Sequence, residues 1–129
     1  RFHDCWPFTG HCAFPAFHNC VKWQSACAQC DYKKEYPRSF VDNSLFNYMD
    51  KKKYFLSVPQ MHIVTVSDWL KAEVGKSFFK GKDICRIYNG VDIEIFQPCK
   101  VEDVNKKYKI NPSKKIVLGV ANRWEPRKG

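Results

Sequence analysis

Helix-like and strand-like segments alternate along the chain from Ser39 onward. Apolar side chains recur at helical spacing in residues 45–56, after Asp42 or Asn43 as the capping residue. The spacing predicts a helix with the three lysines at 51–53 mostly on its solvent face. Its predicted apolar stripe consists of Leu45, Tyr48, Met49, Phe55 and Leu56.

Short apolar runs predict strands at residues 63–66, 84–88 and 116–120. Ser67 is positioned to cap a second helix, which carries Leu70, Val74 and Phe78 on one face and ends near Gly81, and residues 101–108 form a polar, helix-permissive segment. Unbroken apolar strands separated by helices are typical of a parallel sheet that is covered on both faces. We therefore predict an α/β fold.

The Asn89-Gly90 pair leaves two local structures open. The alternation that follows in residues 91–96 suits a two-residue hairpin. A strand that leaves the sheet through a tight turn fits the same residues equally well.

Composition limits the class of protein. The chain has 129 residues with 44% hydrophobic content, which is enough for a core. Its longest apolar runs have five or six residues, against the roughly 20 that a membrane-spanning helix needs. It opens at Arg1 without an initiator methionine or a signal-peptide pattern, and we expect it to be a piece of a longer protein.

The net charge of +9 is concentrated near the C-terminus. We expect a solvated lysine face there, formed by Lys106, Lys107, Lys109, Lys114 and Lys115. Arg123 and Lys128 differ, because they follow the predicted strand at 116–120, and the carboxyl ends of parallel strands are where ligands bind. Two cations in such a loop suit a diphosphate, whereas Arg127 is expected to face solvent.

Five of the seven cysteines fall within the first 30 residues, interleaved with three histidines. A C-x2-C pair can supply two thiolate ligands from one tight turn, and an adjoining loop can supply the others. The preferred zinc ligands are Cys12, Cys20, Cys27 and Cys30. Cys5 is left over, and His11 or His18 could replace one ligand.

Other roles for these cysteines remain open. An odd count without a secretion signal disfavours disulfides, while buried free thiols and an iron–sulfur cluster also fit. A thioredoxin-like role for Cys27 and Cys30 is disfavoured, because the pair ends a cysteine-rich loop instead of opening a helix. Phosphate-loop, dinucleotide-binding, zinc-protease and esterase motifs are absent from the sequence.

Four segments, in this order, resemble motifs of the family-4 retaining glycosyltransferases. They are His3-Asp4-Cys5-Trp6, residues 63–70, Ile87-Tyr88-Asn89-Gly90-Val91-Asp92 with Phe96-Gln97-Pro98, and the strand that ends in residues 123–129. The resemblance implies a GT-B fold, in which two Rossmann-like domains face each other across a cleft. The Cys-rich insert resembles that of bacterial enzymes that build surface polysaccharides.

The resemblance implies a domain assignment. Residues 1–90 would be the latter half of the acceptor-side domain, with the Cys-rich insert at 1–38. Residues 91–112 would be the crossover, and 113–129 the first strand and loop of the donor-side domain. This favours a crossover over a hairpin at Asn89-Gly90.

The resemblance also implies roles for individual residues. His3 would position substrate or stabilise the transition state, with Asp4 orienting its imidazole, and Arg123 and Lys128 would bind the nucleotide diphosphate. Ser67 would cap a helix facing the cleft. Asn89, Gly90 and Asp92 would form the crossover. The family's glutamate pair lies outside this sequence, so we expect the fragment alone to be inactive.

The expected activity is transfer of a sugar, with retention, from a nucleotide-diphosphate donor to a saccharide or lipid-linked acceptor. No catalytic metal is expected, and zinc would be structural. A cytoplasmic enzyme is expected, with peripheral association at the inner face of the membrane left open. The alternative is a zinc-stabilised basic module that binds nucleic acid, but residues 1–30 contain only Arg1 and Lys22 as cations, so no nucleic-acid partner is expected.

Overall fold

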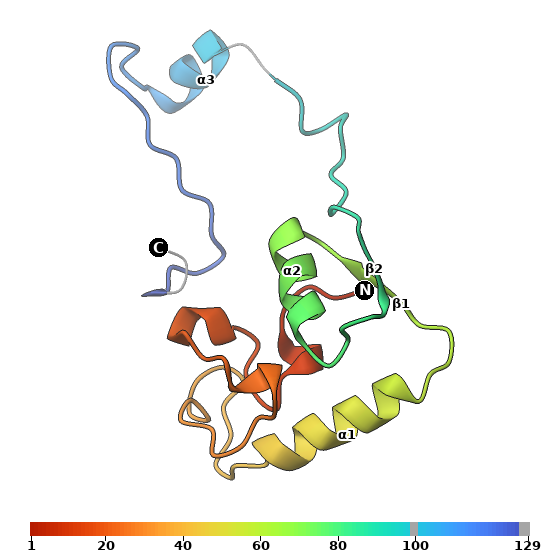
Figure 1. Ribbon diagram of the computed structural model, residues 1–129. Coiled ribbons are helices and arrows are strands. Elements are labelled where there is room, and N and C mark those ends of the chain that lie inside the picture. Colours follow the sequence, from red (N-terminus) through yellow and green to blue (C-terminus); the bar gives the residue numbers. More distant parts are fainter. Residues whose placement is uncertain (99–100, 127–129) are drawn as a thin grey trace. The chain divides into compact units, whose positions relative to one another are not determined.

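Figure 1 shows the computed structural model of the chain, which describes residues 1–98 and 101–126. The chain divides into two compact units, Arg1–Asn89 and Gly90–Gly129. The first unit contains η1 (Trp6–Phe8), η2 (Pro15–His18), η3 (Lys22–Gln24), α1 (Ser44–Leu56), β1 (His62–Thr65), α2 (Asp68–Lys76) and β2 (Asp83–Arg86), where η denotes a 3-10 helix. The described part of the second unit contains α3 (Val101–Tyr108).

The sheet is parallel, which confirms the predicted α/β class. β1 and β2 pair with Ile63 opposite Ile84, and α2 connects the two strands. The N-terminal segment joins the other edge of β1 through a parallel bridge between Phe2 and Thr65. The Phe2 amide donates to the Val64 carbonyl oxygen at 2.8 Å. Three chain segments therefore run in the same direction side by side.

The hydrophobic core joins the Cys-rich segment to the sheet and its helices. Phe8 and Trp23 come from the 3-10 helices, and their ring centroids are 5.1 Å apart. The other fully buried large side chains of this cluster are Tyr48, Ile63, Leu70, Val74 and Phe79. The Cys-rich segment is thus part of the same core as α1 and α2.

Helix α1 forms as predicted, and Tyr48 and Phe55 of the predicted apolar stripe pack in or against the core, but the rest of the stripe is wrong. Leu45, Met49 and Leu56 are exposed. The face turned toward the protein consists of Ser44, Tyr48, Lys51 and Phe55, spaced at helical intervals of four, seven and eleven. The 3-10 helix η1 packs against α1, and Lys51 donates hydrogen bonds to the carbonyl oxygens of Trp6 and Thr9 there. Lys51 is therefore not on the solvent face.

Helix α2 begins as predicted and ends earlier. Ser67 Oγ accepts a hydrogen bond from the Leu70 amide at 3.1 Å, which confirms Ser67 as the cap. The helix ends at Lys76 because Ser77 adopts an extended conformation, while its hydroxyl donates to the Val74 carbonyl oxygen. Gly81, the predicted end, lies beyond the helix with φ 88°.

The second unit differs from expectation in one segment. α3 coincides with the predicted helix, but residues 116–120 do not form a strand, because no neighbouring strand in the described residues pairs with them. Asn89-Gly90 does not open a hairpin either. Instead Asp92 Oδ1 accepts hydrogen bonds from the amides of Glu94 and Ile95 and stabilises a turn.

Across residues 1–98 and 101–126, the helices are too short or too polar to cross a bilayer.

Candidate metal centre and sheet-edge site

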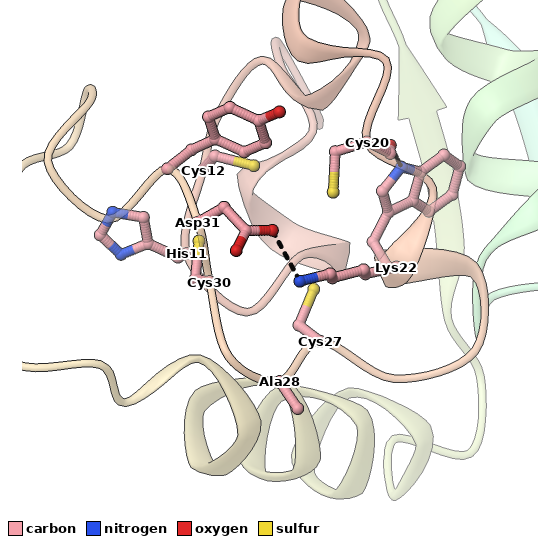
Figure 2. A pocket seen from close by; sticks show the side chains of 10 residues that line it. His11, Cys12, Cys20, Lys22, Cys27, Ala28, Cys30 and Asp31 are labelled. Carbon is pink, nitrogen blue, oxygen red and sulfur yellow. Dashed lines mark hydrogen bonds and ion pairs between the residues drawn. The ribbon is translucent and has the colours of Figure 1, made fainter.

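The four predicted zinc ligands line one small cavity of about 20 Å³ (Figure 2). Its walls come from the loop before η2, the end of η2, and the turn after η3. The lining residues are His11, Cys12, Cys20, Lys22, Trp23, Cys27, Ala28, Cys30, Asp31 and Tyr32. The structure therefore brings together thiols that are up to 18 positions apart in the sequence.

Left-handed backbone turns set the positions of two of these cysteines. Asn19 has φ 51° immediately before Cys20, and Gln29 has φ 48° immediately before Cys30. The Cys30 amide donates to Asp42 Oδ2 at 2.7 Å, and Asp42 Oδ1 accepts from the Ser44 amide at 2.9 Å. Asp42 therefore ties the C-x2-C turn to the N-terminus of α1.

The four thiols influence one another electrostatically. Burial raises the pKa of Cys12 to about 12, with further contributions from Cys30, Cys20 and Cys27. Burial also raises the pKa of Cys27 and of Cys30, while backbone amides of Gly10 and Tyr32, respectively, oppose the increase. Burial therefore favours the neutral thiol form of Cys12, Cys27 and Cys30. All six cysteines in the described residues are free, so none forms a disulfide there.

Cys5 lies outside this cavity. Its side chain is 1% exposed and lies in the hydrophobic core. Burial is the main cause that raises the pKa of Cys5 to about 12, and the nearby carboxylates of Glu73 and Asp4 raise it further. His18 stacks on Tyr32, with the ring centroids 4.0 Å apart. His11 lines the cavity, but Figure 2 shows its ring directed away from the cysteine side chains, and its buried Nε2 atom has no hydrogen-bond partner.

A cation lies beside the thiols. Lys22 Nζ forms an ion pair with Asp31 Oδ2 at 2.8 Å and donates to the Gln29 carbonyl oxygen at 2.8 Å. Figure 2 draws this pair with the cysteine side chains that line the same cavity. Asp31 raises the pKa of Lys22 through this hydrogen bond, and Cys20 and Cys30 contribute in the same direction. Lys22 is thus held at the lining of the thiol cavity.

A second candidate site lies at the carboxyl edge of the sheet. His3 follows the Phe2 bridge, Ser67 follows β1, and Asn89 follows β2, so all three end parallel segments on the same edge. The Arg1 guanidinium donates to the Ile87 carbonyl oxygen at 3.0 Å and to Asn89 Oδ1 at 2.9 Å. Sequence reasoning did not single out Arg1.

Asp4 has a different contact from the one expected. Its Oδ1 atom accepts a hydrogen bond from the Trp6 amide at 2.8 Å and so supports the start of η1. His3 is exposed. A cavity of about 290 Å³ lies beside Asp4, and its lining includes the exposed rings of Trp6 and Tyr36.

The predicted donor-binding and crossover residues lie in different parts of the chain. Arg123 is exposed and lies 3.8 Å from Glu125 Oε1. Gly90 and Asp92 belong to the second unit and Asn89 to the first. Lys128 and Arg127 lie outside the described residues.

Lys51 is the main residue near these sites that sequence reasoning misassigned. It lies half-buried between the Cys-rich segment and α1, and burial lowers its pKa to about 8. The helical spacing of Ser44, Tyr48, Lys51 and Phe55 could have indicated the buried face of the helix. It was missed because the lysine at position 51 made that face look polar.

In the part of the chain that the structure describes, no three or more Cys, His, Asp or Glu side chains are arranged, as they lie, to hold a metal ion. A scan against protein-family models and searches of curated proteins and of solved structures gave no match to this chain.

Proposed function

We propose that the chain is part of a retaining glycosyltransferase that uses a nucleotide-diphosphate sugar as donor and a saccharide or lipid-linked hydroxyl as acceptor. One observation carries the proposal. His3, Ser67 and Asn89, from three separate sequence motifs, lie at the carboxyl edge of one parallel sheet. Ligands of open parallel α/β sheets bind at this edge.

The wall beside this edge suits a sugar ring. The larger cavity combines the Asp4 carboxylate with the exposed faces of Trp6 and Tyr36. Aromatic rings offer an apolar surface to the C–H face of a saccharide, and a carboxylate accepts hydrogen bonds from its hydroxyl groups. We assign this cavity to the acceptor.

The proposed transfer forms a bond between the acceptor oxygen and the anomeric carbon of the donor sugar. The bond from that carbon to the phosphate oxygen breaks, and the nucleotide diphosphate leaves and takes up the acceptor proton. Arg123 and Lys128 would offset the charge that develops on the departing diphosphate, and His3 would position the reacting sugar. In this proposal residues 1–90 belong to the acceptor-side domain of a GT-B enzyme, residues 91–112 to the crossover, and residues 113–129 to the donor-side domain.

The nucleic-acid-binding alternative has less support. Lys22, the cation beside the thiol cavity, is already engaged by Asp31 and by the Gln29 carbonyl oxygen. A nucleic-acid interface needs cations that are available to phosphate groups.

The test uses the enzyme that contains this chain and measures nucleotide diphosphate released from a panel of nucleotide sugars with oligosaccharide acceptors. His3→Ala is expected to lower kcat on the order of 100-fold, as for other groups that act on the transition state. The matched control is His62→Ala, because His62 is also exposed but lies at the start of β1, at the opposite sheet edge, where it pairs with Asp83. Equal losses in the two variants, or no nucleotide release with any donor, would contradict the proposal.

A further inference from the structure

We propose that Cys12, Cys20, Cys27 and Cys30 bind a single Zn²⁺ ion as four thiolates, and that Lys22 is the neighbouring cation that stabilises this site. The site is structural and separate from the proposed transfer reaction. The geometry goes further than the sequence, because it excludes Cys5 from the cavity, directs His11 away from the thiols and adds Lys22.

The size of the cavity favours one ion. A volume of about 20 Å³ is close to that of one water molecule by the same kind of measure, for which about 10–15 Å³ suffices. A four-iron cluster, with eight metal and sulfide atoms, needs several times this space. Four sulfur ligands without an open position are typical of structural zinc.

The side chains must turn inward to reach the ion. With Zn–S bonds of about 2.3 Å, tetrahedral geometry brings neighbouring sulfur atoms to about 3.8 Å from one another. Among the described residues the thiols, as they lie, are not yet grouped in this arrangement. Because all four already line one cavity, rotations about the Cα–Cβ bonds are the main change required. Each thiol releases its proton to water as its Zn–S bond forms.

Backbone amides support the charge that the sulfur atoms would carry. The Gly10 amide donates toward Cys27, and the Tyr32 amide donates toward Cys30. Tyr32 lies two residues after Cys30, so the chain folds back over the thiol immediately after the C-x2-C turn. Hydrogen bonds of this kind orient metal ligands and stabilise the thiolate form.

Lys22 places one positive charge beside the site, and the Asp31 carboxylate with which it pairs offsets part of that charge. Four thiolates and one Zn²⁺ ion carry a net charge of −2, which needs compensation in a partly buried site. The Lys22 ammonium is held at the cavity by the Gln29 carbonyl oxygen and by Asp31. It can approach the sulfur atoms without moving away from the C-x2-C turn.

The test uses the complete chain, refolded without metal under reducing conditions and titrated with Zn²⁺ or Co²⁺. We expect one Zn²⁺ per chain by elemental analysis, and visible absorption bands of tetrahedral cobalt thiolate with Co²⁺. Single Cys→Ser variants at positions 12, 20, 27 and 30 should lose these bands. Cys85→Ser, a change at an exposed position, should keep them.

Two further variants distinguish the details. Lys22→Gln is expected to weaken Zn²⁺ binding by about 10- to 100-fold in chelator competition, as neighbouring groups of metal ligands do, whereas Lys52→Gln on the exposed part of α1 should not. His11→Ala should leave the cobalt spectrum unchanged. Loss of the spectrum in His11→Ala would overturn the all-cysteine site.

If a variant fails to fold, the proposal can still be tested by a measurement on the wild-type chain. The cobalt spectrum of the wild-type chain alone distinguishes thiolate ligation from its absence. Binding of less than one ion per chain, or purification with bound iron and sulfide, would overturn the proposal. Because transferase activity is not part of this test, failure of the metal site and failure of the proposed function are separate outcomes.

Discussion

The ammonium group of Lys51 lies 3.5 Å from the centre of the Trp6 ring and donates a hydrogen bond to the Trp6 carbonyl oxygen at 2.7 Å. It also donates to the Thr9 carbonyl oxygen at 2.9 Å. Thr9 follows the last residue of η1, and the Trp6 carbonyl oxygen also accepts a hydrogen bond from the Thr9 amide at 3.4 Å. One side chain of α1 therefore completes the hydrogen bonding of the segment that follows His3 and Asp4.

Replacing Lys51 with methionine should destabilise the protein. The apolar stem is kept, but the Trp6 and Thr9 carbonyl oxygens lose their hydrogen bonds from Lys51, which costs about 1–3 kcal/mol in the free energy of unfolding. Lys52→Met, at an exposed position of the same helix, is the control and should change it by less than about 0.5 kcal/mol. Urea unfolding at pH 7 measures both. Equal effects would show that the Lys51 contacts contribute nothing.

Stability should also depend on pH through Lys51. Burial lowers its pKa from 10.5 to about 8, so between these values the unfolded chain binds more protons than the folded one. The contribution of Lys51 to stability is therefore complete above pH 10.5 and is lost as the pH falls through 8. The difference in unfolding free energy between the wild type and Lys51→Met should increase from pH 8 to 10.5. Lys51 also lowers the pKa of Cys27, so the comparison is repeated in a Cys27→Ser background. A constant difference would contradict the lowered pKa.

Gly10 should not tolerate a side chain. A Cβ atom there would overlap the Ser44 carbonyl oxygen and approach Cys27 Cβ to 2.6 Å. Gly10→Ala must displace backbone, at a cost of about 3 kcal/mol. Gly75→Ala is the control, because a Cβ atom at this position of α2 meets nothing within 4 Å and should stabilise the helix by about 0.5–1 kcal/mol. Thermal unfolding compares them, and a neutral Gly10→Ala would show that the close packing is absent.

Thiol reactivity should follow burial. In the metal-free chain at pH 8, Cys85 is exposed, while burial raises the pKa values of Cys5 and Cys12 to about 12. Because the thiolate is the reactive form, a maleimide should modify Cys85 first and Cys5 and Cys12 much more slowly. Peptide mapping after brief labelling measures the order, in a Cys99→Ser background because Cys99 lies outside the described residues. Faster labelling of Cys12 than of Cys85 would contradict the structure.

Sequence reasoning succeeded where the determining interactions are local. Ser67 caps the helix three residues before Leu70, and the β-branched run before it pairs in parallel with β2. Cys12, Cys20, Cys27 and Cys30 also line one cavity, because close spacing keeps them near one another, while their role as metal ligands stays a prediction.

The errors arose where contacts between residues far apart in the sequence determine the local structure. The buried face of α1 is selected by the 3-10 helices, whose carbonyl groups require a lysine that the hydrophobic pattern assigned to solvent. A strand at residues 116–120 would require a pairing partner, and the described residues provide none. Neither requirement is encoded within the segment itself.

The shared core has a consequence for engineering the Cys-rich segment. Phe8 and Trp23 from this segment pack with Tyr48 of α1, whose hydroxyl donates to the Ser25 carbonyl oxygen at 2.9 Å. Excising or grafting the segment alone would remove half of a packed interface and expose the rest. In a chimeric protein, the Cys-rich segment and α1 must therefore be transferred together.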